Sequence, residues 1–590
     1  VSSSNNAAHV AGALGVPTAC MLPVSLDHGR RWYWLADGAR TPWYPSVRLI
    51  PQRQPNQWLD VIRDAGLAVL ETAIAKHRVS SADYYREMIS AFASMKRRED
   101  AEAVCEHMAR DPALAAEAYL NIAELRRAAL DAPGVFAACD KAIAADPGCW
   151  EAYNQKGITL HDLHRFDEAI AVYLQGLQQN ATSHLLHSNL GKSCHQLGRY
   201  GEALHHHRLA LAHAPPEKTS AITAIRLNYA SALGDSGDID QALALTEAII
   251  EDAPETVDAH YNRALILLAL ERWQDGWRDF AWRLKRSNVV VTYDAFPHIK
   301  PWAGESLAGK KVLIWSEHGI GDEILASTMI PDAIAAARKV VVLCSERLVP
   351  LFRRSFPGIT AEPLKAPLPQ ITKATDFDFQ MALWDLGIAF RSNADAFKAR
   401  TRFLIPDVQR VASLRKRYAA VKPGNLIVGI SWASPSNQEM GWLKASRLES
   451  WLPILQVPGI TFVNLQYGDQ RPTLARFREE FDIEIVNDTS IDPLKDMDAY
   501  AAQVAAMDLV ISTSNTLVHT AGAVGTPTWV LLAKGRGQIW YWLQDRADSL
   551  WYASVRLIRQ ENAGDWTQPI ETCAHDLRKV SQEKRESGTS

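Results

Sequence analysis

The 590-residue sequence predicts a mixed α and α/β protein, in which an α-solenoid of helical repeats precedes two doubly wound α/β domains. Three observations support this fold class. Matched residues recur every 34 positions in the middle of the chain, short apolar runs alternate with helical segments after residue 300, and a segment near the C-terminus recurs at the start. A single hydrophobic core does not grow to this length, so we expect several domains.

The 34-residue period is clearest between WEAYNQKGITLHDLHRFDEAIAVYLQGLQQNA and HLLHSNLGKSCHQLGRYGEALHHHRLALAHAP. The matched pairs are Gly157 and Gly191, Phe166 and Tyr200, Ala169 and Ala203, and Tyr173 and His207. The small residues let two helices approach closely, and the aromatic residues fill the space between neighbouring pairs. Such a pattern is typical of tetratricopeptide repeats, which are stacked helical hairpins. We place the solenoid at residues 80–290 and expect its concave face to bind a protein or peptide, the alternative being a spacer or a dimerisation element.

After residue 300 the pattern changes to strands and helices in alternation. VLIW and VVVLC are short apolar runs of the kind that parallel sheets bury, and the first of them leads through a glycine-containing loop into a helix. A second series of strands follows in NLIVGISWAS, ITFVNLQYG, DLVISTS and PTWVLLA. We therefore predict two Rossmann-type domains, at residues 300–410 and 411–577, with a cleft bordered by the loops at the carboxyl ends of their strands.

The first candidate site is the loop SEHGIGDEI, which follows the first of these strands. Gly319 and Gly321 leave the backbone free to approach a ligand, and Asp322 opens the following helix. A carboxylate there either favours the N-terminus of the helix or serves as a general base aimed into the cleft. Because the loop lacks the third glycine of a dinucleotide-binding fingerprint, an oxidoreductase has little support.

The second candidate site is ISTSNTLVHTAGAVGTPT, where a strand leads into a helix. Ser514, Asn515 and Thr516 form the turn, and His519 follows one helical turn later. Ser or Asn caps a helix N-terminus, where free backbone N–H groups and the helix dipole attract an anion such as a diphosphate. The alternative is a well-capped helix in which His519 is a satisfied structural partner.

Two further loops complete the candidate site. Lys444 lies in a polar loop after a strand, where its charge can neutralise a leaving phosphate. Gln466 and Tyr467 lie at the end of the strand in NLQYGD, where they can contact a base or a ribose. A lysine in a loop is more often only solvated, and Gln466 and Tyr467 are equally ordinary loop residues, so each signal is weak in isolation.

Together, the segments GIGDE, FRRSFPGI, NLQYGD, SNTLVHTAGAVGTPTWVLL and WYWL with SLWYASVRLIRQ resemble the bacterial tetratricopeptide-repeat glycosyltransferases. That group is related to glycosyltransferase family 9, the heptosyltransferase group, and has a GT-B fold built from a pair of Rossmann-type domains. The resemblance covers the repeats and residues 300–560. It implies an inverting, metal-independent transfer of a sugar from a nucleotide-sugar donor, with no cofactor besides this substrate.

The resemblance also implies roles for individual residues. Asp322 corresponds to the acidic residue proposed as general base for the acceptor, and Lys444 stands near the basic residue that steadies the departing diphosphate. The turn at residues 514–516 and His519 match the donor-binding turn and helix. The predicted donor-binding residues are Gly319, Gly321, Lys444, Gln466, Tyr467, Ser514, Asn515, Thr516 and His519. The heptosyltransferases carry Asp-Thr-Gly at this turn, where this chain has Ser514, Asn515 and Thr516. Because a carboxylate is lost there, the alternative is a catalytically reduced or a sugar-binding role.

The N-terminal segment, residues 1–66, is a partial copy of the second Rossmann-type domain. Residues 1–60 align with residues 511–568, first at a shift of 510 positions and then at a shift of 508. Ser4, Asn5 and His9 repeat the turn and helix of the second candidate site. So few elements cannot bury a Rossmann-like sheet. We expect a truncated domain without catalysis of its own, the alternative being that the segment packs on another part of this chain or on a neighbour.

Composition limits the remaining classes of function. Lys and Arg total 63 against 67 Asp and Glu, which argues against a dedicated nucleic-acid or anionic-membrane surface. The seven cysteines are scattered without a CxxC motif, so we expect reduced thiols and no metal site. No apolar run is long enough to span a bilayer, and we expect a cytoplasmic protein. The polar tail, residues 578–590, is expected to be disordered.

The expected function is a glycosyltransferase that moves a sugar from a nucleotide-sugar donor to an acceptor, most simply a protein recruited by the repeats. The first alternative is a non-catalytic scaffold whose transferase domain is a remnant. The second alternative is an enzyme that acts on lipopolysaccharide-type glycans, with the repeats serving assembly only.

Overall fold

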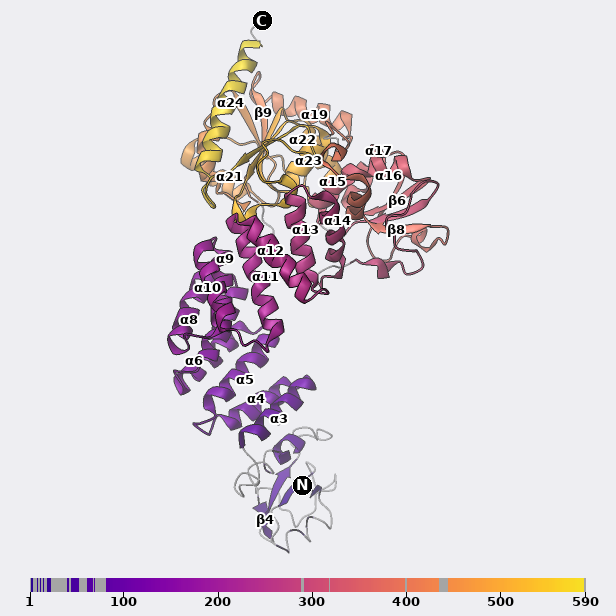
Figure 1. Cartoon of the computed structure of the whole chain (residues 1–590). Coiled ribbons are helices and arrows are strands. Elements are labelled where there is room, and N and C mark those ends of the chain that lie inside the picture. Colours follow the sequence, from indigo (N-terminus) through magenta and orange to yellow (C-terminus); the bar gives the residue numbers. More distant parts are fainter. Residues whose placement is uncertain are drawn as a thin grey trace. The chain divides into compact units, whose positions relative to one another are not determined.

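The computed structural model describes residues 2–3, 8, 11, 14, 18–22, 40–41, 44–51, 61–66, 68, 81–287, 291–317, 319–397, 400–433 and 444–587. The chain forms two compact units, and Figure 1 colours it from the N-terminus to the C-terminus. The first unit consists of Val1–Leu197 with His205–Pro216, and the second of Gly198–Leu204 with Glu217–Ser590. Repeat helices occur in both units, and the second unit also contains two larger parallel sheets.

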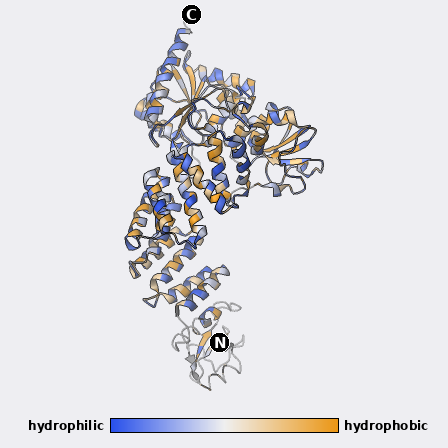
Figure 2. Ribbon diagram, in the orientation of Figure 1, coloured by the Kyte–Doolittle hydropathy of each residue, from blue (hydrophilic) through white to orange (hydrophobic). Residues whose placement is uncertain are grey.

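The first unit is built mainly from consecutive helices that pack against their neighbours in sequence. These helices are α3 (Ser81–Ser94), α4 (Arg98–Met108), α5 (Ala115–Ala128), α6 (Ala132–Ala145), α7 (Trp150–Asp162), α8 (Phe166–Gln179), α9 (His184–Gln196) and most of α10 (Tyr200–His213). Figure 2 shows hydrophobic and hydrophilic residues mixed along each of them, as expected for amphipathic helices. Buried residues such as Val104, Ala118 and Val135 form one continuous core between α3 and α6.

Two glycines of the repeat period lie where neighbouring helices touch. A Cβ atom added at Gly157 in α7 would lie 2.3 Å from the ring of Tyr173 in α8. A Cβ atom added at Gly191 in α9 would lie 2.8 Å from the ring of His207 in α10. The same packing therefore recurs after 34 residues, which confirms that the small residues admit the ring of the partner helix.

We expect Gly157→Ala to lower the free energy of unfolding by about 1–3 kcal/mol, because the Tyr173 ring is buried and has no room to retreat. Urea denaturation followed by circular dichroism measures the change. Gly201→Ala in α10 is the matched control, since a Cβ atom there meets nothing within 4 Å. The control should be neutral or stabilising by up to about 1 kcal/mol, and equal effects at the two positions would contradict the packing argument.

The repeats continue in the second unit and end inside the α/β part. The helices are α11 (Thr219–Ser236), α12 (Ile239–Asp252), α13 (Val257–Ala269) and the short α14 (Trp273–Phe280), followed by a 3₁₀ turn, η3 (Ala281–Lys285). Trp273, Trp277 and Phe280 of α14 belong to the same hydrophobic core as the first sheet. The Trp277 indole also donates a hydrogen bond of 2.8 Å to the carbonyl of Arg391. The last repeat is therefore built into the α/β part.

The first sheet has four parallel strands in the order β7-β6-β5-β8. These are β5 (Lys311–Trp315), β6 (Lys339–Cys344), β7 (Ile359–Pro363) and β8 (Phe379–Ala382). The helices that accompany them are α15 (Ile320–Ala326), α16 (Ile330–Ala336), α17 (Val349–Ser355) and α18 (Leu386–Phe390). Every residue of β5 is buried, as predicted for the run VLIW.

The second sheet has five parallel strands in the order β10-β9-β11-β12-β13. The strands are β9 (Leu426–Ser431), β10 (Ile460–Asn464), β11 (Leu509–Thr513), β12 (Thr528–Leu532) and β13 (Val555–Arg559). Their helices are α19 (Val408–Ala419), α20 (Leu452–Leu455), α21 (Arg471–Phe481), α22 (Met497–Ala505), α23 (Thr516–Val524) and α24 (Thr567–Ser587). Helical repeats followed by parallel α/β regions are thereby confirmed.

The N-terminal segment forms a small sheet in the order β1-β2-β4-β3. Its strands are β1 (Ser2–Ser3), β2 (Thr18–Leu22), β3 (Arg40–Thr41) and β4 (Tyr44–Pro51). Thr18 pairs with Val47 in parallel, just as Thr528 pairs with Val555 in the second sheet. The likeness of the two copies thus extends from their sequence to their strand register. Ser4, Asn5 and His9, the N-terminal counterparts of the second candidate site, lie outside the described residues.

The expected disorder of residues 578–590 is wrong for 578–587, which continue helix α24. Leu577 is fully buried in the core of the second sheet, so the helix is anchored just before this stretch. Ser581 then donates a hydrogen bond of 2.7 Å to the carbonyl of Pro458, and the Lys584 ammonium lies 2.9 Å from the Asp508 carboxylate. Residues 588–590 lie outside the described part. Among the helices that the structure describes, none combines the length and apolar character needed to cross a membrane.

Candidate functional site

The loops at the carboxyl ends of three neighbouring strands are joined by side-chain hydrogen bonds. The Asn515 amide, after β11, donates a hydrogen bond of 2.8 Å to the hydroxyl of Ser431 at the end of β9. That hydroxyl donates in turn to Gln466 Oε1, after β10, over 2.8 Å. Asn515 Oδ1 also accepts from the backbone N–H of Leu517 and so caps α23. This chain of bonds fixes the relative positions of two predicted donor-binding residues, Asn515 and Gln466.

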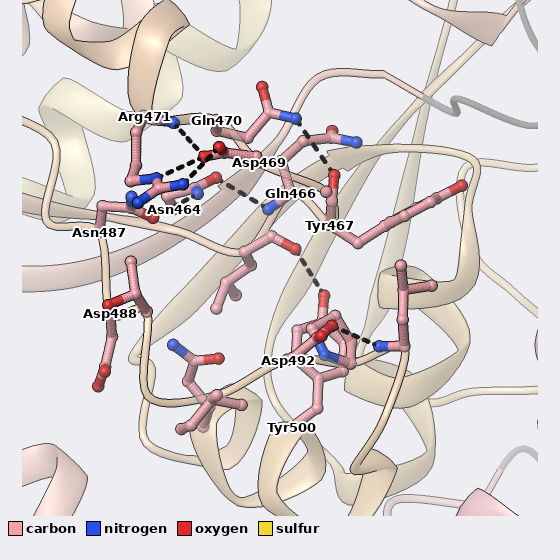
Figure 3. Close-up of a pocket in the computed structure, with 17 residues that line it drawn as sticks. Asn464, Gln466, Tyr467, Asp469, Gln470, Arg471, Asn487, Asp488, Asp492 and Tyr500 are labelled. Atoms are coloured by element: carbon pink, nitrogen blue, oxygen red, sulfur yellow. Dashed lines mark hydrogen bonds and ion pairs between the residues drawn. The ribbon is translucent and has the colours of Figure 1, made fainter.

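A cavity of about 470 Å³ lies beside this chain of bonds, and we call it the β10 cavity. It is lined by residues 464–471 after β10, by residues 487–489 and 491–494, and by Tyr500 and Gln503. Figure 3 shows Gln466 and Tyr467 among the amide, carboxylate and hydroxyl side chains of this cavity. Gln466 Nε2 is a buried N–H donor without a partner among the described residues. A buried donor of this kind needs an acceptor, which a bound ligand can supply.

His519 is enclosed by aromatic side chains. Its two ring nitrogens are hydrogen-bonded to the hydroxyls of Tyr552, at 3.1 Å, and Tyr541, at 3.2 Å. Its ring also stacks on Trp542 with an interplanar angle of 4°. Burial, together with the charge of Lys444, lowers the pKa of His519 to about 3, so the imidazole is neutral at physiological pH. His519 thus holds α23 in place. It lines neither the β10 cavity nor the cavity that contains Asp322, which matches the alternative of a satisfied structural partner.

The two sequence motifs of the candidate site meet where α15 packs on α23. A Cβ atom added at Gly321 would lie 3.2 Å from His519 Cδ2 and 3.3 Å from Thr516 Oγ1. Gly321 therefore serves close packing between helices, where the sequence predicted access for a ligand. Gly319 is the N-cap of α15 and has an ordinary φ of −65°. Ser514 is buried and accepts a hydrogen bond of 2.9 Å from the indole of Trp542.

Asp322 and Lys444 line a second cavity, of about 450 Å³, which we call the Asp322 cavity. Burial raises the pKa of Asp322 to about 6, and the charge of Lys444 offsets part of that rise. Burial lowers the pKa of Lys444, and Asp322 offsets that shift in the same way. A carboxylate with a pKa near neutrality is suited to general-base catalysis, because it can take up a proton at working pH.

Apart from Gly319 and Gly321, the predicted residues fall into three groups in the structure. Asp322 and Lys444 share the Asp322 cavity, and Gln466 and Tyr467 share the β10 cavity. The turn at residues 514–516 and His519 lie in the packed region from which the hydrogen bonds of Asn515 reach the β10 cavity. Among the described residues there is no group of three or more side chains arranged to hold a metal ion.

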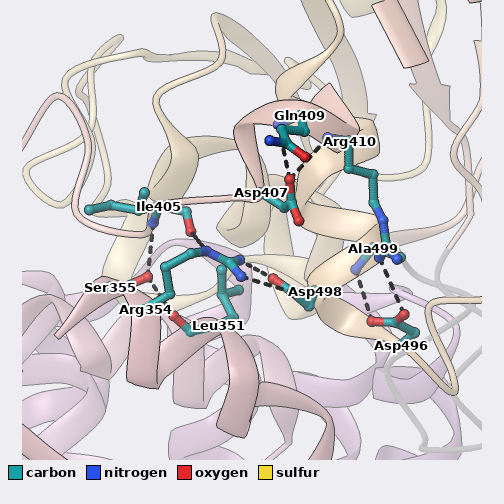
Figure 4. Close-up of polar contacts among 10 residues, drawn as sticks. All are labelled: Leu351, Arg354, Ser355, Ile405, Asp407, Gln409, Arg410, Asp496, Asp498 and Ala499. Carbon is teal, nitrogen blue, oxygen red and sulfur yellow. Dashed lines mark hydrogen bonds and ion pairs between the residues drawn. The ribbon is translucent and has the colours of Figure 1, made fainter. Parts of the chain in front are cut away.

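The two α/β regions are also joined away from the cavities. In Figure 4 the Arg354 guanidinium of α17 faces the Asp498 carboxylate of α22, and the two form an ion pair. Arg354 also donates a hydrogen bond of 2.6 Å to the carbonyl of Ile405. A further bond of 3.1 Å joins Arg347, before α17, to the carbonyl of Pro493. These contacts hold the first sheet's helices against the second region.

The aromatic partners of His519 were not predicted from the sequence. Tyr541, Trp542 and Tyr552 surround the imidazole, yet they lie 22 to 33 residues further along the chain. The N-terminal copy contained a sequence signal that could have identified these partners. His9 is followed there by Tyr33, Trp34 and Tyr44 at the matching positions, so the histidine and its three ring partners were retained together in both copies.

Comparison with known proteins identifies the family to which this chain belongs. The tetratricopeptide repeat family matches residues 137–184, 154–217 and 227–276. Protein FlbA of Caulobacter vibrioides is 33% identical over 450 residues, which are 74% of this chain and 74% of that protein. The chain belongs to the FlbA family. A match of 450 residues is longer than the stretch of repeat helices, so the relationship to FlbA also includes α/β sequence.

Solved structures are similar to parts of this FlbA-family protein. YrrB, described as a TPR protein with an unusual peptide-binding site, is 23% identical and covers 28% of this chain and 84% of its own, with a TM-score of 0.24. PilW, a type IV pilus biogenesis factor, is 17% identical and covers 41% and 94%, with a TM-score of 0.30. MamA of Desulfovibrio magneticus RS-1 is 15% identical and covers 29% and 96%, with a TM-score of 0.26. The repeats themselves mark the protein as a protein-interaction scaffold.

Proposed function

We propose that this FlbA-family protein is a glycosyltransferase related to family 9, whose two α/β regions act as a GT-B-like pair. It transfers a sugar from a nucleotide-sugar donor to a hydroxyl group of an acceptor recruited by the repeats, with inversion and without a metal ion. The observation that carries the proposal is the shared cavity of Asp322, whose pKa is raised to about 6, and Lys444.

The proposed reaction uses the two charged groups in sequence. The Asp322 carboxylate removes the proton of the acceptor hydroxyl, and the oxygen attacks the anomeric carbon of the donor sugar. The bond from that carbon to the diphosphate oxygen breaks, and the nucleoside diphosphate leaves with the electron pair. Lys444 stabilises the negative charge that builds on the leaving group. Attack opposite the leaving group inverts the configuration of the anomeric carbon.

The β10 cavity is the proposed site of the nucleoside. Its volume lies within the range of about 300–1,000 Å³ that is usual for small-molecule sites. Tyr467 offers a ring beside a base, and the unpartnered Gln466 Nε2 offers a donor to a base or ribose oxygen. The hydrogen bonds of Asn515 through Ser431 to Gln466 connect this cavity to the turn where the resemblance places the donor.

A non-catalytic scaffold is the second candidate, and one observation favours it. The Ser514 hydroxyl is bonded to Trp542, and Asn515 and His519 are held by neighbouring side chains. Because these polar side chains already have hydrogen-bond partners, the turn offers mainly its backbone groups to a nucleotide-sugar donor.

The test is a panel of nucleoside diphosphates and nucleotide sugars on the full chain. We expect one nucleoside diphosphate to raise the melting temperature, because a ligand at about 100 times its Kd stabilises the native state by about 2.7 kcal/mol. Asn487→Ala in the β10 cavity should reduce that shift, whereas Asn562→Ala, on an exposed loop, should leave it unchanged. If no nucleotide stabilises the protein and no nucleotide sugar is turned over, the scaffold function replaces the transferase.

A further inference from the structure

Tyr541 is a lining residue of the Asp322 cavity to which the proposed reaction gives no role. The cavity is bounded by Ile266 and other residues of α13, and by residues 538–541 from the segment that follows β12. Asp322, Lys444 and Tyr541 all line it, and all of these residues belong to the second compact unit. A ligand that reaches the proposed catalytic carboxylate would therefore also meet Tyr541.

The hydroxyl of Tyr541 is one end of a chain of hydrogen bonds through His519. The Nε2 atom of His519 lies 3.2 Å from the Tyr541 hydroxyl, and its Nδ1 atom lies 3.1 Å from the Tyr552 hydroxyl. Because this imidazole is neutral, one of its nitrogens carries a hydrogen and donates, and the other accepts. The two tyrosine hydroxyls therefore have opposite roles toward the ring.

Tyr552 determines which nitrogen carries the hydrogen. Its side chain is 0% exposed, and within the described ranges its hydroxyl has His519 Nδ1 as its one hydrogen-bond partner. A buried O–H group without an acceptor is unfavourable, so the Tyr552 hydroxyl donates to Nδ1. The hydrogen of His519 then lies on Nε2, which donates to the oxygen of Tyr541. Tyr541 faces a cavity, where its own O–H group can find another acceptor.

The oxygen of Tyr541 is an acceptor toward the protein. The Ser514 hydroxyl accepts a hydrogen bond from the indole of Trp542, which can only donate, so its own hydrogen is available for Tyr541. Burial raises the pKa of Tyr541 well above its ordinary value, the charge of Asp322 raises it further, and a hydrogen bond from Ser514 opposes part of that rise. Tyr541 therefore keeps its proton at physiological pH and acts as a donor, not as a base.

We infer that Tyr541 donates a hydrogen bond to an oxygen of the departing diphosphate beside Lys444, and that His519 is the positioning residue that turns the Tyr541 O–H group into the cavity. This inference rests on the proposed transferase function. A donor bonded to Asp322 would only reduce the basicity of that carboxylate. The leaving oxygen gains negative charge, so a hydrogen bond to it becomes stronger in the transition state. His519 thus acts on the donor through Tyr541, whereas the resemblance assigned it to the donor directly.

Tyr541→Phe tests the hydroxyl alone, because it keeps the ring that packs edge-on against His519. We expect kcat to fall about 10²-fold and the KM for the nucleotide sugar to change by less than about threefold. Inorganic pyrophosphate carries the charge that the leaving group gains, and its binding, measured by titration calorimetry in EDTA, should weaken about tenfold. Tyr119→Phe is the matched control, since it removes a half-buried hydroxyl on α5 that lines neither cavity, and it should change none of these quantities.

Two replacements of His519 test its positioning role. His519→Gln keeps an amide N–H for the Tyr541 oxygen, whereas His519→Met has a similar length and no donor. The glutamine variant should transfer sugar at least about fivefold faster than the methionine variant. Equal rates of transfer by the two variants would assign His519 to packing alone and overturn the positioning role.

The position of the imidazole hydrogen is measured in the wild-type full chain, so it decides the matter even if Tyr541→Phe does not fold. Two-bond ¹H–¹⁵N correlation spectra of protein with ¹⁵N-labelled histidine distinguish the two tautomers. The signals of His519 are those missing from His519→Gln. A hydrogen on Nε2 supports the inference, and a hydrogen on Nδ1 overturns it.

Pyrophosphate binding and sugar transfer together separate this inference from the proposed function. Weaker binding and slower transfer in Tyr541→Phe support both. Weaker binding in Tyr541→Phe, with no nucleotide sugar turned over by the wild type, supports a phosphate contact at Tyr541 and overturns the transferase. Transfer and pyrophosphate affinity that Tyr541→Phe leaves unchanged support the transferase and overturn the inference. A wild-type protein that binds no pyrophosphate also overturns the inference.

Discussion

Replacing Asp322 by asparagine is expected to lower the rate of sugar transfer by about 10²–10⁴-fold, because the amide cannot accept the proton of the acceptor hydroxyl. The same replacement should raise the stability of the protein at neutral pH. Burial raises the pKa of Asp322 from 3.8 to about 6, so the folded state holds a carboxylate that would be better solvated in the unfolded chain. An uncharged isostere removes that cost. Loss of activity with a gain of stability is the pattern of a carboxylate retained for function.

The stability gain of Asp322→Asn should depend on pH in a defined direction. Below pH 3.8 the carboxyl group of Asp322 is protonated in the folded and in the unfolded state. Ionisation of Asp322 should then cause no difference in stability between the wild type and Asp322→Asn. The gain should grow between pH 3.8 and about 6 and reach up to about 3 kcal/mol above that range, since each unit of pKa difference is worth about 1.4 kcal/mol. The rate of sugar transfer by the wild-type protein should rise over the same pH interval, because Asp322 loses its proton there.

Urea denaturation at several pH values and initial rates of transfer measure these effects. Asp545→Asn is the matched control, since Asp545 is exposed on the loop after β12 and should change neither quantity appreciably. If the Asp322→Asn protein keeps more than about half of the wild-type rate of sugar transfer, Asp322 is not the catalytic base. A loss of stability at neutral pH would show that the carboxylate makes a structural contact instead.

Local patterns predicted the architecture well. The spacing of Gly157 and Gly191 already indicated where helices touch, and the structure places a ring against each of them. The run VLIW is a fully buried strand, as its continuous apolar character indicated. These features are recorded either in a short run of neighbouring residues or in a fixed repeat period, which is why one sequence is sufficient to recognise them.

The surroundings of the candidate site depend on contacts far apart in the chain. Asn515 bonds to Ser431, 84 residues earlier, and His519 is held by hydroxyl groups that follow 22 and 33 residues later. No periodic pattern in the sequence indicates such distant pairs. The sequence of a capped turn followed by a histidine is therefore compatible both with a ligand site and with a structural role. The wall that α13 gives to the Asp322 cavity was unpredictable for the same reason. The tail was misjudged because its composition is polar, whereas its helix is anchored by a few specific contacts.

Removing the guanidinium in Arg283→Met is expected to lower the free energy of unfolding of the second unit by about 3–5 kcal/mol, because it leaves two buried carboxylates without their partner. Arg283 follows α14, and its side chain is 2% exposed. It lies 2.7 Å from Glu317, in the loop that leads to Asp322, and 2.9 Å from Asp385. Tyr293 also donates a hydrogen bond of 2.6 Å to Asp385. Arg283 thus ties the loop that precedes Asp322 to the end of the repeats.

The matched control is Arg278→Met, whose side chain is 74% exposed and pairs with Asp275 at the surface. Such a pair contributes about 0–1 kcal/mol, so the two arginines differ mainly in burial. The double variant Arg283→Met with Glu317→Gln should recover part of the loss, because one unpaired charge is gone. Urea denaturation of the single, double and control variants measures these differences, and equal losses for Arg283→Met and Arg278→Met would contradict the argument.

The loss in Arg283→Met should also become smaller as the pH falls. Burial raises the pKa of Glu317 above its ordinary value even beside Arg283, and the pKa rises further once the guanidinium is absent. A protonated Glu317 needs no cationic partner, so the variant should lose less stability at about pH 5.5 than at about pH 8. A loss that is the same at both pH values would assign the effect to packing of the arginine stem alone. The pH dependence therefore distinguishes a charge that positions the Asp322 loop from a side chain that only fills space.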